Sequence, residues 1–430
     1  MTSLALRSAA PTLARSRNVT RLQHGLMWLI GASGGIVVIE PAPYEFVVIL
    51  AMVVFAATGL TLRPAHLPLL FLLTAYNVGY LIGVVPVATE EDTVTWTAVS
   101  CFMSVTTLFF AMALVEDTER RLDMLLKGYV AIAVVAAVFG IVTYFHLVPG
   151  SDPFLFASRS RSTFKDPNVL GPFLVLPCLL ALQRTMTGRL RDFLVGGAMT
   201  AVMVIELLLA FSRGAWGAFA AAAALMLALT YVTSGSGRER RRIIAITALG
   251  TVALGAMIVV ILSIPQVADL FQERASLVQD YDSGRFGRFG RHILGALLAL
   301  DKPFGIGPLQ FSKYFPEDPH NSFLDSFMAG GWLSGAAYIA LILVTLAIGL
   351  RYVFVRTPWR PAYIALYATF VAETGESYVI DVQHWRHYFL IMGVLWGLVI
   401  AAVMRRRARG SRAASPASSP VASGARSHPA

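Results

Sequence analysis

Long apolar runs recur along nearly the whole of this 430-residue chain, and they restrict what it can fold into. Each run reaches the roughly 20 residues that an α-helix needs to cross about 30 Å of hydrocarbon. The composition agrees, because 14% of the residues are charged, against about 25% in soluble domains. Membrane-spanning strands would instead give short alternating segments. The sequence therefore predicts an all-α polytopic membrane protein.

We expect about twelve transmembrane helices, with boundaries accurate to a few residues. They cover residues 22–39, 44–62, 66–87, 93–115, 127–147, 168–184, 191–212, 214–232, 243–264, 332–350, 362–378 and 387–404. The chain then divides into a cytoplasmic segment (1–21), nine helices (22–264), a large loop on the outer side (265–331), three helices (332–404) and a disordered cytoplasmic tail (405–430).

The orientation follows from the basic residues, which gather in cytoplasmic loops. With the N-terminus inside, 24 of the 35 Lys and Arg residues lie on the cytoplasmic side, and both termini are cytoplasmic. No small-residue cleavage site follows the first apolar run, so this run is expected to be an uncleaved anchor. The net charge of +10 comes mostly from these anchors and the Arg-rich tail. It does not indicate binding to nucleic acid.

Eleven basic residues remain on the periplasmic side, against the usual bias. They are Arg159, Arg161, Lys165, Arg213, Arg274, Arg285, Arg288, Arg291, Lys302, Lys313 and Arg386. Basic residues on this face indicate an anionic partner.

Arg213 ends an apolar run in the segment FSRGAWG (211–217). One interpretation is that its guanidinium reaches the lipid headgroups and does nothing more. The other is that it faces a cavity, since a buried Arg is costly and the flanking Gly214 and Gly217 permit close helix approach. We favour the cavity.

The repeat GRFGRFGR supplies Arg285, Arg288 and Arg291 at intervals of three residues. Residues three apart share a helix face, so two of these arginines could bind two phosphates. The alternative is a basic amphipathic helix, expected over residues 288–300, that is attracted to anionic lipid.

His320 lies between Pro319 and Asn321, just before an apolar run that Asn321 or Ser322 could cap. A lone loop histidine is more often simply solvated. Three observations favour catalysis: carboxylates lie nearby at Asp318 and Asp325, the loop upstream is basic, and an imidazole suits proton transfer near neutral pH.

Other polar side chains are weaker candidates for a functional site. Asp381, His384 and His387 have a spacing that could hold a metal, but the Trp and Tyr beside them favour a membrane-interface role, and we expect no metal site. The intramembrane acids either line a cavity or form structural ion pairs, and these are Glu206, Glu373 and Glu376.

Four motifs in order resemble the O-antigen ligase and O-antigen polymerase superfamily of bacterial polysaccharide membrane proteins. They are RSTFKDPNVLGPFL (161–174), FSRGAWG, GRFG ahead of KPFGIGPLQF (302–311), and DPHNSFLDSFMAGGWLSG (318–335). The resemblance covers about residues 150 to 340. It implies a GT-C-like glycosyltransferase of the inner membrane that acts at the periplasmic face and needs no cofactor or metal.

By this resemblance His320, Arg213 and Arg288 are catalytic. The substrate-binding candidates that it adds are Arg161, Lys165, Arg285, Arg291 and Asn321. The repeated RFG leaves open which of the three loop arginines contacts the diphosphate. The Ala329-Gly330-Gly331 segment departs from the family pattern, which often has an acidic residue before the glycine.

The implied reaction transfers a glycan from undecaprenyl diphosphate to an acceptor sugar with inversion. His320 is the general base, and the arginines stabilise the diphosphate. The acceptor is either a growing O-antigen or exopolysaccharide, which makes the protein a polymerase, or lipid A core, which makes it a ligase, and polymerase is slightly favoured. The partners expected are these lipid-linked glycans, the bilayer and other polysaccharide assembly proteins. The competing class is a flippase that uses the same arginines as a binding site.

Overall fold

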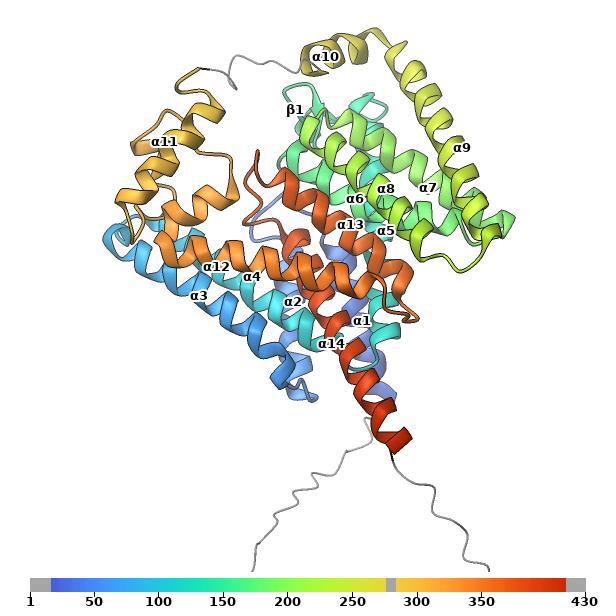
Figure 1. Cartoon of the computed structure of the whole chain (residues 1–430). Coiled ribbons are helices and arrows are strands. Elements are labelled where there is room, and N and C mark those ends of the chain that lie inside the picture. The colour runs from blue at the N-terminus through green and yellow to red at the C-terminus, as the bar shows by residue number, and fades with distance from the viewer. Residues whose placement is uncertain (1–16, 276–283, 415–430) are drawn as a thin grey trace, which may run out of the picture.

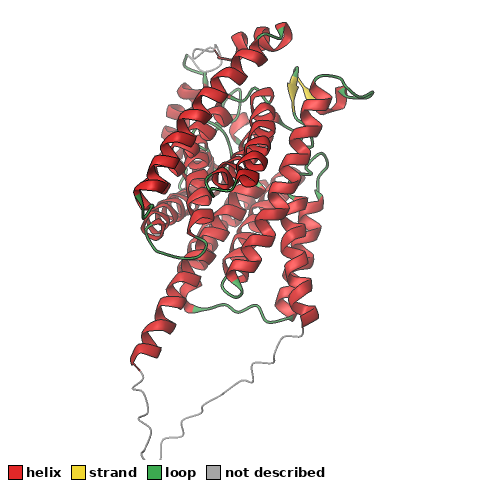
Figure 2. Cartoon of the chain, turned by 90° about the vertical axis from the view of Figure 1, so that its right-hand side faces the viewer, coloured by secondary structure: helices red, strands yellow, loops and turns green. Residues whose placement is uncertain are grey.

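The computed structural model describes residues 17–275 and 284–414, and helices make up most of this part (Figure 2). Two short strands, β1 (Leu155–Phe156) and β2 (Arg159–Ser160), pair as an antiparallel hairpin. The architecture confirms the all-α polytopic fold class predicted from the apolar runs. Most of the two terminal segments expected in the cytoplasm lies outside the described residues.

Each of the expected spans overlaps one helix. These helices are α1 (Arg17–Ser33), α2 (Pro43–Ala57), α3 (Leu67–Val84), α4 (Glu91–Ala113), α5 (Thr118–Tyr144), α6 (Pro167–Thr185), α7 (Leu190–Leu209), α8 (Arg213–Thr233), α9 (Gly237–Leu262), α12 (Ser322–Val353), α13 (Arg360–Glu376) and α14 (Arg386–Ala414). Two further helices, α10 (Pro265–Ala275) and α11 (Arg288–Asp301), lie between α9 and α12.

In the described ranges, nine helices are long and apolar enough to cross a membrane, fewer than the roughly twelve spans expected. The difference comes from α1, α2 and α13, which have 17, 15 and 17 residues. At about 1.5 Å per residue these three helices reach only about 22–26 Å, at or below the lower limit for a span. The expected and observed helices therefore differ in length and not in position.

The helices form one bundle around α14 (Figure 1). Its apolar window is 89% buried, whereas that of α9, at the edge of the bundle in Figure 1, is 6% buried. A central helix is surrounded by protein, and a peripheral apolar helix faces lipid in a membrane. The packing thus explains why two segments of similar hydropathy have opposite surroundings.

Small residues allow close contacts between helices α3 and α12. A Cβ atom added at Gly79 would lie 2.6 Å from the carbonyl oxygen of Gly330, and one at Gly83 would overlap the carbonyl of Ala329. Backbones approach this closely only where side chains are absent, as is common in membrane bundles. Gly331, with φ of 68°, then bends α12 where it passes Pro303.

We call the end of the bundle that carries α10, α11 and the β1–β2 hairpin the loop end, and the opposite end, where α14 finishes, the tail end (Figure 1). The helix expected over 288–300 is α11. Its apolar side chains Ile293, Leu297 and Leu300 are exposed, which suits a helix at the membrane surface. The next helix, α12, begins at Ser322, within the segment assigned to the large loop.

Candidate active site at the loop end

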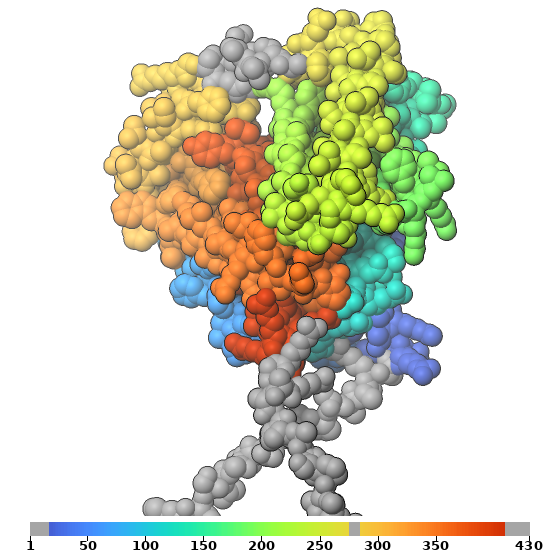
Figure 3. Space-filling view, turned by 45° about the vertical axis from the view of Figure 1, so that its right-hand side comes forward, coloured from blue at the N-terminus to red at the C-terminus, as the bar shows by residue number. Residues whose placement is uncertain are grey.

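A cavity of about 660 Å³ opens at the loop end. Seen from the side in Figure 3, the surface is hollowed between α11 and the green helices α7 and α8. We call it the arginine cavity, because four arginines line it together with His320. Its lining includes Arg159, Asp166, Asn168, Ser212, Arg213, Arg274, Arg288, Phe289, His320, Glu376, Asp381 and Trp385.

Arg213 is the first residue of α8. The chain turns sharply from α7 into α8 through Phe211, whose φ is 46°, and Ser212 caps the new helix by accepting a hydrogen bond from the backbone N–H of Ala215 at 3.5 Å. This turn places the guanidinium at the cavity wall. Of the two interpretations of Arg213, contact with lipid headgroups or with a cavity, the structure thus agrees with the cavity.

Arg288 is likewise the first residue of its helix, α11. That helix is fixed against the bundle on one side, where Gly295 packs on the side chains of Phe311 and Leu324. The N-terminus of α11 therefore has a defined position at the cavity. Of the three repeat arginines, Arg288 is the one that lines it.

His320 is held in place by its neighbours in the chain. Its backbone has a φ of 48°, a conformation that non-glycine residues adopt uncommonly. On one side, the carbonyl oxygen of Pro319 lies 2.7 Å from Nε2 of His292 on α11. On the other, the side chain of Asn321 accepts a hydrogen bond from the backbone N–H of Leu324 at 3.0 Å and so caps α12. The imidazole thereby has a fixed place in the wall.

Burial lowers the pKa of His320 below its ordinary value, and the positive charge of Arg288 lowers it further. The carboxylate of Asp318 acts in the opposite direction. Both leading effects disfavour the imidazolium form. His320 is therefore a neutral imidazole near pH 7, able to accept a proton.

Several helix N-termini meet at the arginine cavity. The first turns of α6, α8 and α11 line it, and His320 precedes α12 by two residues. A helix N-terminus carries partial positive charge and backbone N–H groups without intrahelical partners. Together with four arginines, this arrangement is suited to a multiply charged anion.

A comparison with family models finds one match. Residues 198–339 match the family described as O-Antigen ligase. This match, over about a third of the chain, supports the resemblance to the O-antigen ligase and polymerase superfamily. No curated protein matches the chain.

We call residues 198–339 the O-antigen ligase segment, after the family that they match. It contains Arg213, Arg274, Arg288 and His320, all of which line the arginine cavity. The remaining wall comes from outside it: Arg159, Asp166 and Asn168 precede the segment, and Glu376, Asp381 and Trp385 follow it. The cavity is thus completed by parts of the chain that the family match does not include.

The O-antigen ligase segment is joined to the preceding chain through Arg159. Its Nε donates to the carbonyl oxygen of Ala210 at 2.8 Å, and its Nη2 donates to Oδ1 of Asn168 at 2.7 Å. The family resemblance favours Arg161, the basic residue ahead of the DPN motif, whereas Arg159 is the residue that lines the cavity. Arg274, on α10, was also counted among the outer basic residues without being assigned a role.

The other predicted substrate-binding residues do not line the arginine cavity. The guanidinium of Arg161 donates to the carbonyl oxygens of Pro153, at 3.0 Å from Nε, and Lys165, at 3.2 Å from Nη1. The ammonium of Lys165 pairs with Glu40 at 2.9 Å. Both residues therefore have protein partners in the loop before α6.

Arg285, Arg291 and Asn321 also have structural contacts. The guanidinium of Arg285 lies 5.6 Å from the ring centroid of Phe286. Arg291 is 4% exposed and pairs with Glu317 at 2.8 Å. Asn321 is the cap of α12. The three-residue spacing of the repeat thus places successive arginines in different surroundings.

The three intramembrane acidic residues lie in different surroundings. Glu376 lines the arginine cavity, with its carboxylate against Gly214 beside Arg213. Glu206 is fully buried and accepts a hydrogen bond from the hydroxyl of Ser160 at 2.5 Å. An oxygen of Glu373 lies 3.6 Å from Nε2 of His387 inside the bundle. Of the three acids, Glu376 alone therefore belongs to the lining.

Asp381 connects the α13–α14 loop to the start of α12. Its carboxylate accepts hydrogen bonds from the hydroxyl of Ser322 at 3.1 Å and the backbone N–H of Gln383 at 3.2 Å. Burial raises the pKa of Asp381 above its ordinary value, although these hydrogen bonds oppose the shift. The loop thereby brings a carboxyl group to the wall that contains His320.

The three residues whose spacing suggested a metal site, Asp381, His384 and His387, lie apart in the structure. The ring of His384 lies on Trp96, with centroids 3.8 Å apart, and contacts the hydroxyl of Ser100 at 2.9 Å. His387 lies beside Glu373, and Asp381 contacts Ser322. Among the described residues, no group of three His, Cys, Asp or Glu side chains is placed to hold a metal ion.

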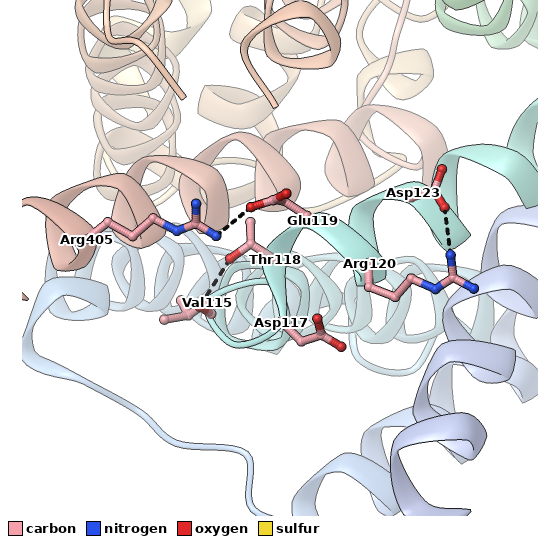
Figure 4. A pocket seen from close by; sticks show the side chains of 7 residues that line it. All are labelled: Val115, Asp117, Thr118, Glu119, Arg120, Asp123 and Arg405. Atoms are coloured by element: carbon pink, nitrogen blue, oxygen red, sulfur yellow. Dashed lines mark hydrogen bonds and ion pairs between the residues drawn. The ribbon is translucent and has the colours of Figure 1, made fainter. Parts of the chain in front are cut away.

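A different pocket, of about 680 Å³, lies at the tail end, between the start of α5 and α14 (Figure 4). Arg405 pairs there with Glu119 at 2.8 Å, and Arg120 lies 3.5 Å from Asp123. The first pair joins α14 to α5, and the second lies within α5, at a wide, shallow surface. Of these two pockets, the one at the loop end has the arginines and helix N-termini that suit an anion.

Proposed function

We propose that this protein is a glycosyltransferase that transfers a glycan from a polyprenyl diphosphate to an acceptor sugar at the periplasmic face of the bacterial inner membrane. The observation that carries the proposal is the arginine cavity, where Arg213, Arg288 and His320 come together from separate elements. The match of residues 198–339 to the O-Antigen ligase family supports the same reaction class.

The arginines are assigned to the leaving group. When the bond between the anomeric carbon and the diphosphate breaks, negative charge develops on the diphosphate oxygens. Arg213 and Arg288 stabilise this charge by charge-assisted hydrogen bonds, aided by the N-termini of α8 and α11. Because guanidinium groups stay protonated at any physiological pH, the site is ready for the donor without a prior protonation step.

His320 is assigned to the acceptor. Its neutral imidazole accepts the proton of the acceptor hydroxyl as the hydroxyl oxygen attacks the anomeric carbon. One displacement of this kind inverts the configuration at that carbon. The polyprenyl chain extends between the helices while the glycan lies at the loop end, so binding also orients the two reactants.

The sidedness follows from the basic residues. In the orientation that places most Lys and Arg in the cytoplasm, the loop end faces the periplasm. A polymerase adding repeat units is favoured over a ligase to lipid A core, because the segments GRFG and FGIGPLQF are more similar to exopolysaccharide-type members of the family.

The test uses the full-length protein in proteoliposomes with lipid-linked glycan extracted from the source bacterium. His320→Ala should reduce glycan transfer by about 10²–10⁴-fold, the usual contribution of a general base. His146→Ala is the matched control, because this histidine is exposed in a loop at the same end. Transfer by His320→Ala at near the wild-type rate would refute the base assignment.

The glycans of a deletion strain distinguish the three remaining functions: polymerase, ligase and flippase. Loss of long glycan chains indicates a polymerase, and full-length chains retained on the lipid carrier indicate a ligase. Lipid-linked units that stay inaccessible from the periplasm indicate a flippase and contradict the proposal.

A further inference from the structure

A second cavity, of about 930 Å³, adjoins the arginine cavity. The two share four lining residues, Asp166, Val169, Asp381 and Trp385. The rest of its wall comes from the α1–α2 loop, the first turn of α2, the N-terminal half of α4, the start of α14, and the loops before α6, α12 and α14. A ligand bound in the second cavity would therefore lie beside one bound among the arginines.

The second cavity, which we call the carboxylate cavity, differs from the first in charge. Besides the shared aspartates it is lined by Glu40, Glu45 and Asp92. Its two basic residues are neutralised within the protein: Lys165 pairs with Glu40 at 2.9 Å, and Arg386 pairs with both Glu45 and Glu40.

Its histidine adds no positive charge. Burial, together with the nearby Arg386, lowers the pKa of His384 to about 4, so the ring is neutral near pH 7. A phosphate group entering this cavity would meet uncompensated carboxylates, and like charges at close range repel. The cavity is unsuited to a phosphorylated ligand.

The polar atoms of the carboxylate cavity suit hydroxyl groups. Within the described residues, Oε2 of Glu45 and Nε1 of Trp96 are buried without a hydrogen-bond partner. One accepts and the other donates a hydrogen bond, and a sugar hydroxyl can serve both. Buried polar atoms normally have partners, so these two atoms can bind a polar ligand in this cavity.

Aromatic rings complete the wall. Trp96, Phe102, Phe164 and Trp385 line the cavity, and the ring of His384 lies against that of Trp96, with centroids 3.8 Å apart. Flat apolar faces with carboxylates around them match a sugar, which has apolar C–H faces and polar hydroxyl edges.

We propose that the carboxylate cavity binds the acceptor sugar, and that this acceptor is a glycan without phosphate near its attacking hydroxyl. The inference rests on the proposed function and deepens it. The acceptor hydroxyl reaches the donor across the shared wall of Asp381 and Trp385. A phosphate-free acceptor fits a growing polysaccharide better than a phosphorylated lipid core.

The experiment measures two reactions of the purified full-length protein in nanodiscs. The first is hydrolysis of the donor, in which water takes the place of the acceptor sugar, and it is measured as the release of polyprenyl diphosphate. Transfer is followed with two soluble acceptors: a phosphate-free oligosaccharide of the bacterium's own repeat unit, and a phosphorylated core oligosaccharide. The wild-type protein should use the first acceptor with the lower KM.

Trp96→Leu should raise the KM for the phosphate-free acceptor about tenfold, because it removes the stacking face, and should leave donor cleavage unchanged. The matched control is Trp28→Leu, at an exposed tryptophan of α1 away from the cavity. Asp92→Lys is a second variant that does not depend on core packing, since Asp92 is exposed. It should lower the KM for the phosphorylated acceptor.

The outcomes separate the two proposals. Unchanged acceptor KM in both Trp96→Leu and Asp92→Lys, or a wild-type preference for the phosphorylated acceptor, would overturn the acceptor site while leaving the proposed function intact. Quenching of Trp96 emission by brominated phospholipid, unaffected by added oligosaccharide, would assign the cavity to lipid and overturn it also. A wild-type protein that neither cleaves the donor nor transfers glycan would overturn the proposed function, and this inference with it.

Discussion

The ring Nε2 of His292 lies 2.7 Å from the carbonyl oxygen of Pro319 and donates a hydrogen bond to it. His292 is on α11, four residues after Arg288, and Pro319 immediately precedes His320. This contact therefore joins the helix that begins with one catalytic candidate to the loop that holds another. Because the two candidates are fixed relative to each other, His292 is a positioning residue.

His292→Ala should lower kcat more than it raises the donor KM, because His320 loses its fixed position while the arginines remain. His292→Gln keeps an N–H donor and should recover part of kcat. The measurement is steady-state kinetics of both variants beside the wild type. Equal kcat in His292→Ala and wild type would mean that the contact has no role in positioning.

Replacement of Arg291 should affect stability more than transfer. Its guanidinium is buried, pairs with Glu317 and donates to the carbonyl oxygen of Phe286 at 3.1 Å. Arg291→Ala leaves that carbonyl and Glu317 without this donor, at a cost of about 1–3 kcal/mol in unfolding free energy. Thermal unfolding in detergent should show the loss, while kcat stays above that of Arg288→Ala. A lower kcat in Arg291→Ala than in Arg288→Ala would exchange their assigned roles.

The transfer rate should fall at acidic pH as His320 becomes protonated. Burial and Arg288 lower the pKa of His320, so the midpoint of the acidic limb of kcat/KM should lie below the ordinary value of about 6.5. Asp318 raises this pKa by stabilising the imidazolium. Asp318→Asn should therefore move the midpoint to still lower pH. A midpoint that stays in place or moves upward would show that His320 is not the titrating group.

Removal of the hydroxyl that donates to Glu206 should loosen the hairpin next to it. Ser160 neighbours Arg159, so this hydrogen bond fixes the strand that presents Arg159 to the cavity. Ser160→Ala leaves a buried carboxyl oxygen without its donor and should lower the unfolding temperature and raise the donor KM. Ser158→Ala, at an exposed position of the same hairpin, is the control. Equal effects of the two changes would contradict the role of the contact.

Close packing of α3 on α12 should not tolerate added atoms. Gly83→Ala places a Cβ against the carbonyl of Ala329, and overpacking of this kind typically costs about 1–3 kcal/mol or more. Gly217→Ala on α8 is the matched control, since a Cβ there meets no atom within 4 Å. The yield of folded protein by size-exclusion chromatography should fall for Gly83→Ala and not for Gly217→Ala. Equal yields would mean that the two helices can separate without penalty.

Much of the fold could be predicted from the chain because its main constraint is local. A run of apolar residues must become a helix in a membrane, where each backbone N–H and C=O needs a partner within the segment. This made the positions of the twelve helices α1 to α9 and α12 to α14 predictable, whereas α10 was not expected. The ends of the helices were less predictable: the span was expected from residue 332, whereas α12 begins at Ser322, where Asn321, one of the two cap candidates in the sequence, caps it.

The sequence by itself determined the helices, the excess of basic residues on one face and the family motifs that contain Arg213, Arg288 and His320. Only the tertiary structure decided which other side chains share their cavity. Arg159 lines it and Arg161 does not, because Arg159 contacts Ala210 on a helix end 51 residues away. Asp381 reaches the same wall because the α13–α14 loop is bonded to Ser322. Such neighbours are set by packing between distant segments, and spacing along the chain holds no information about it.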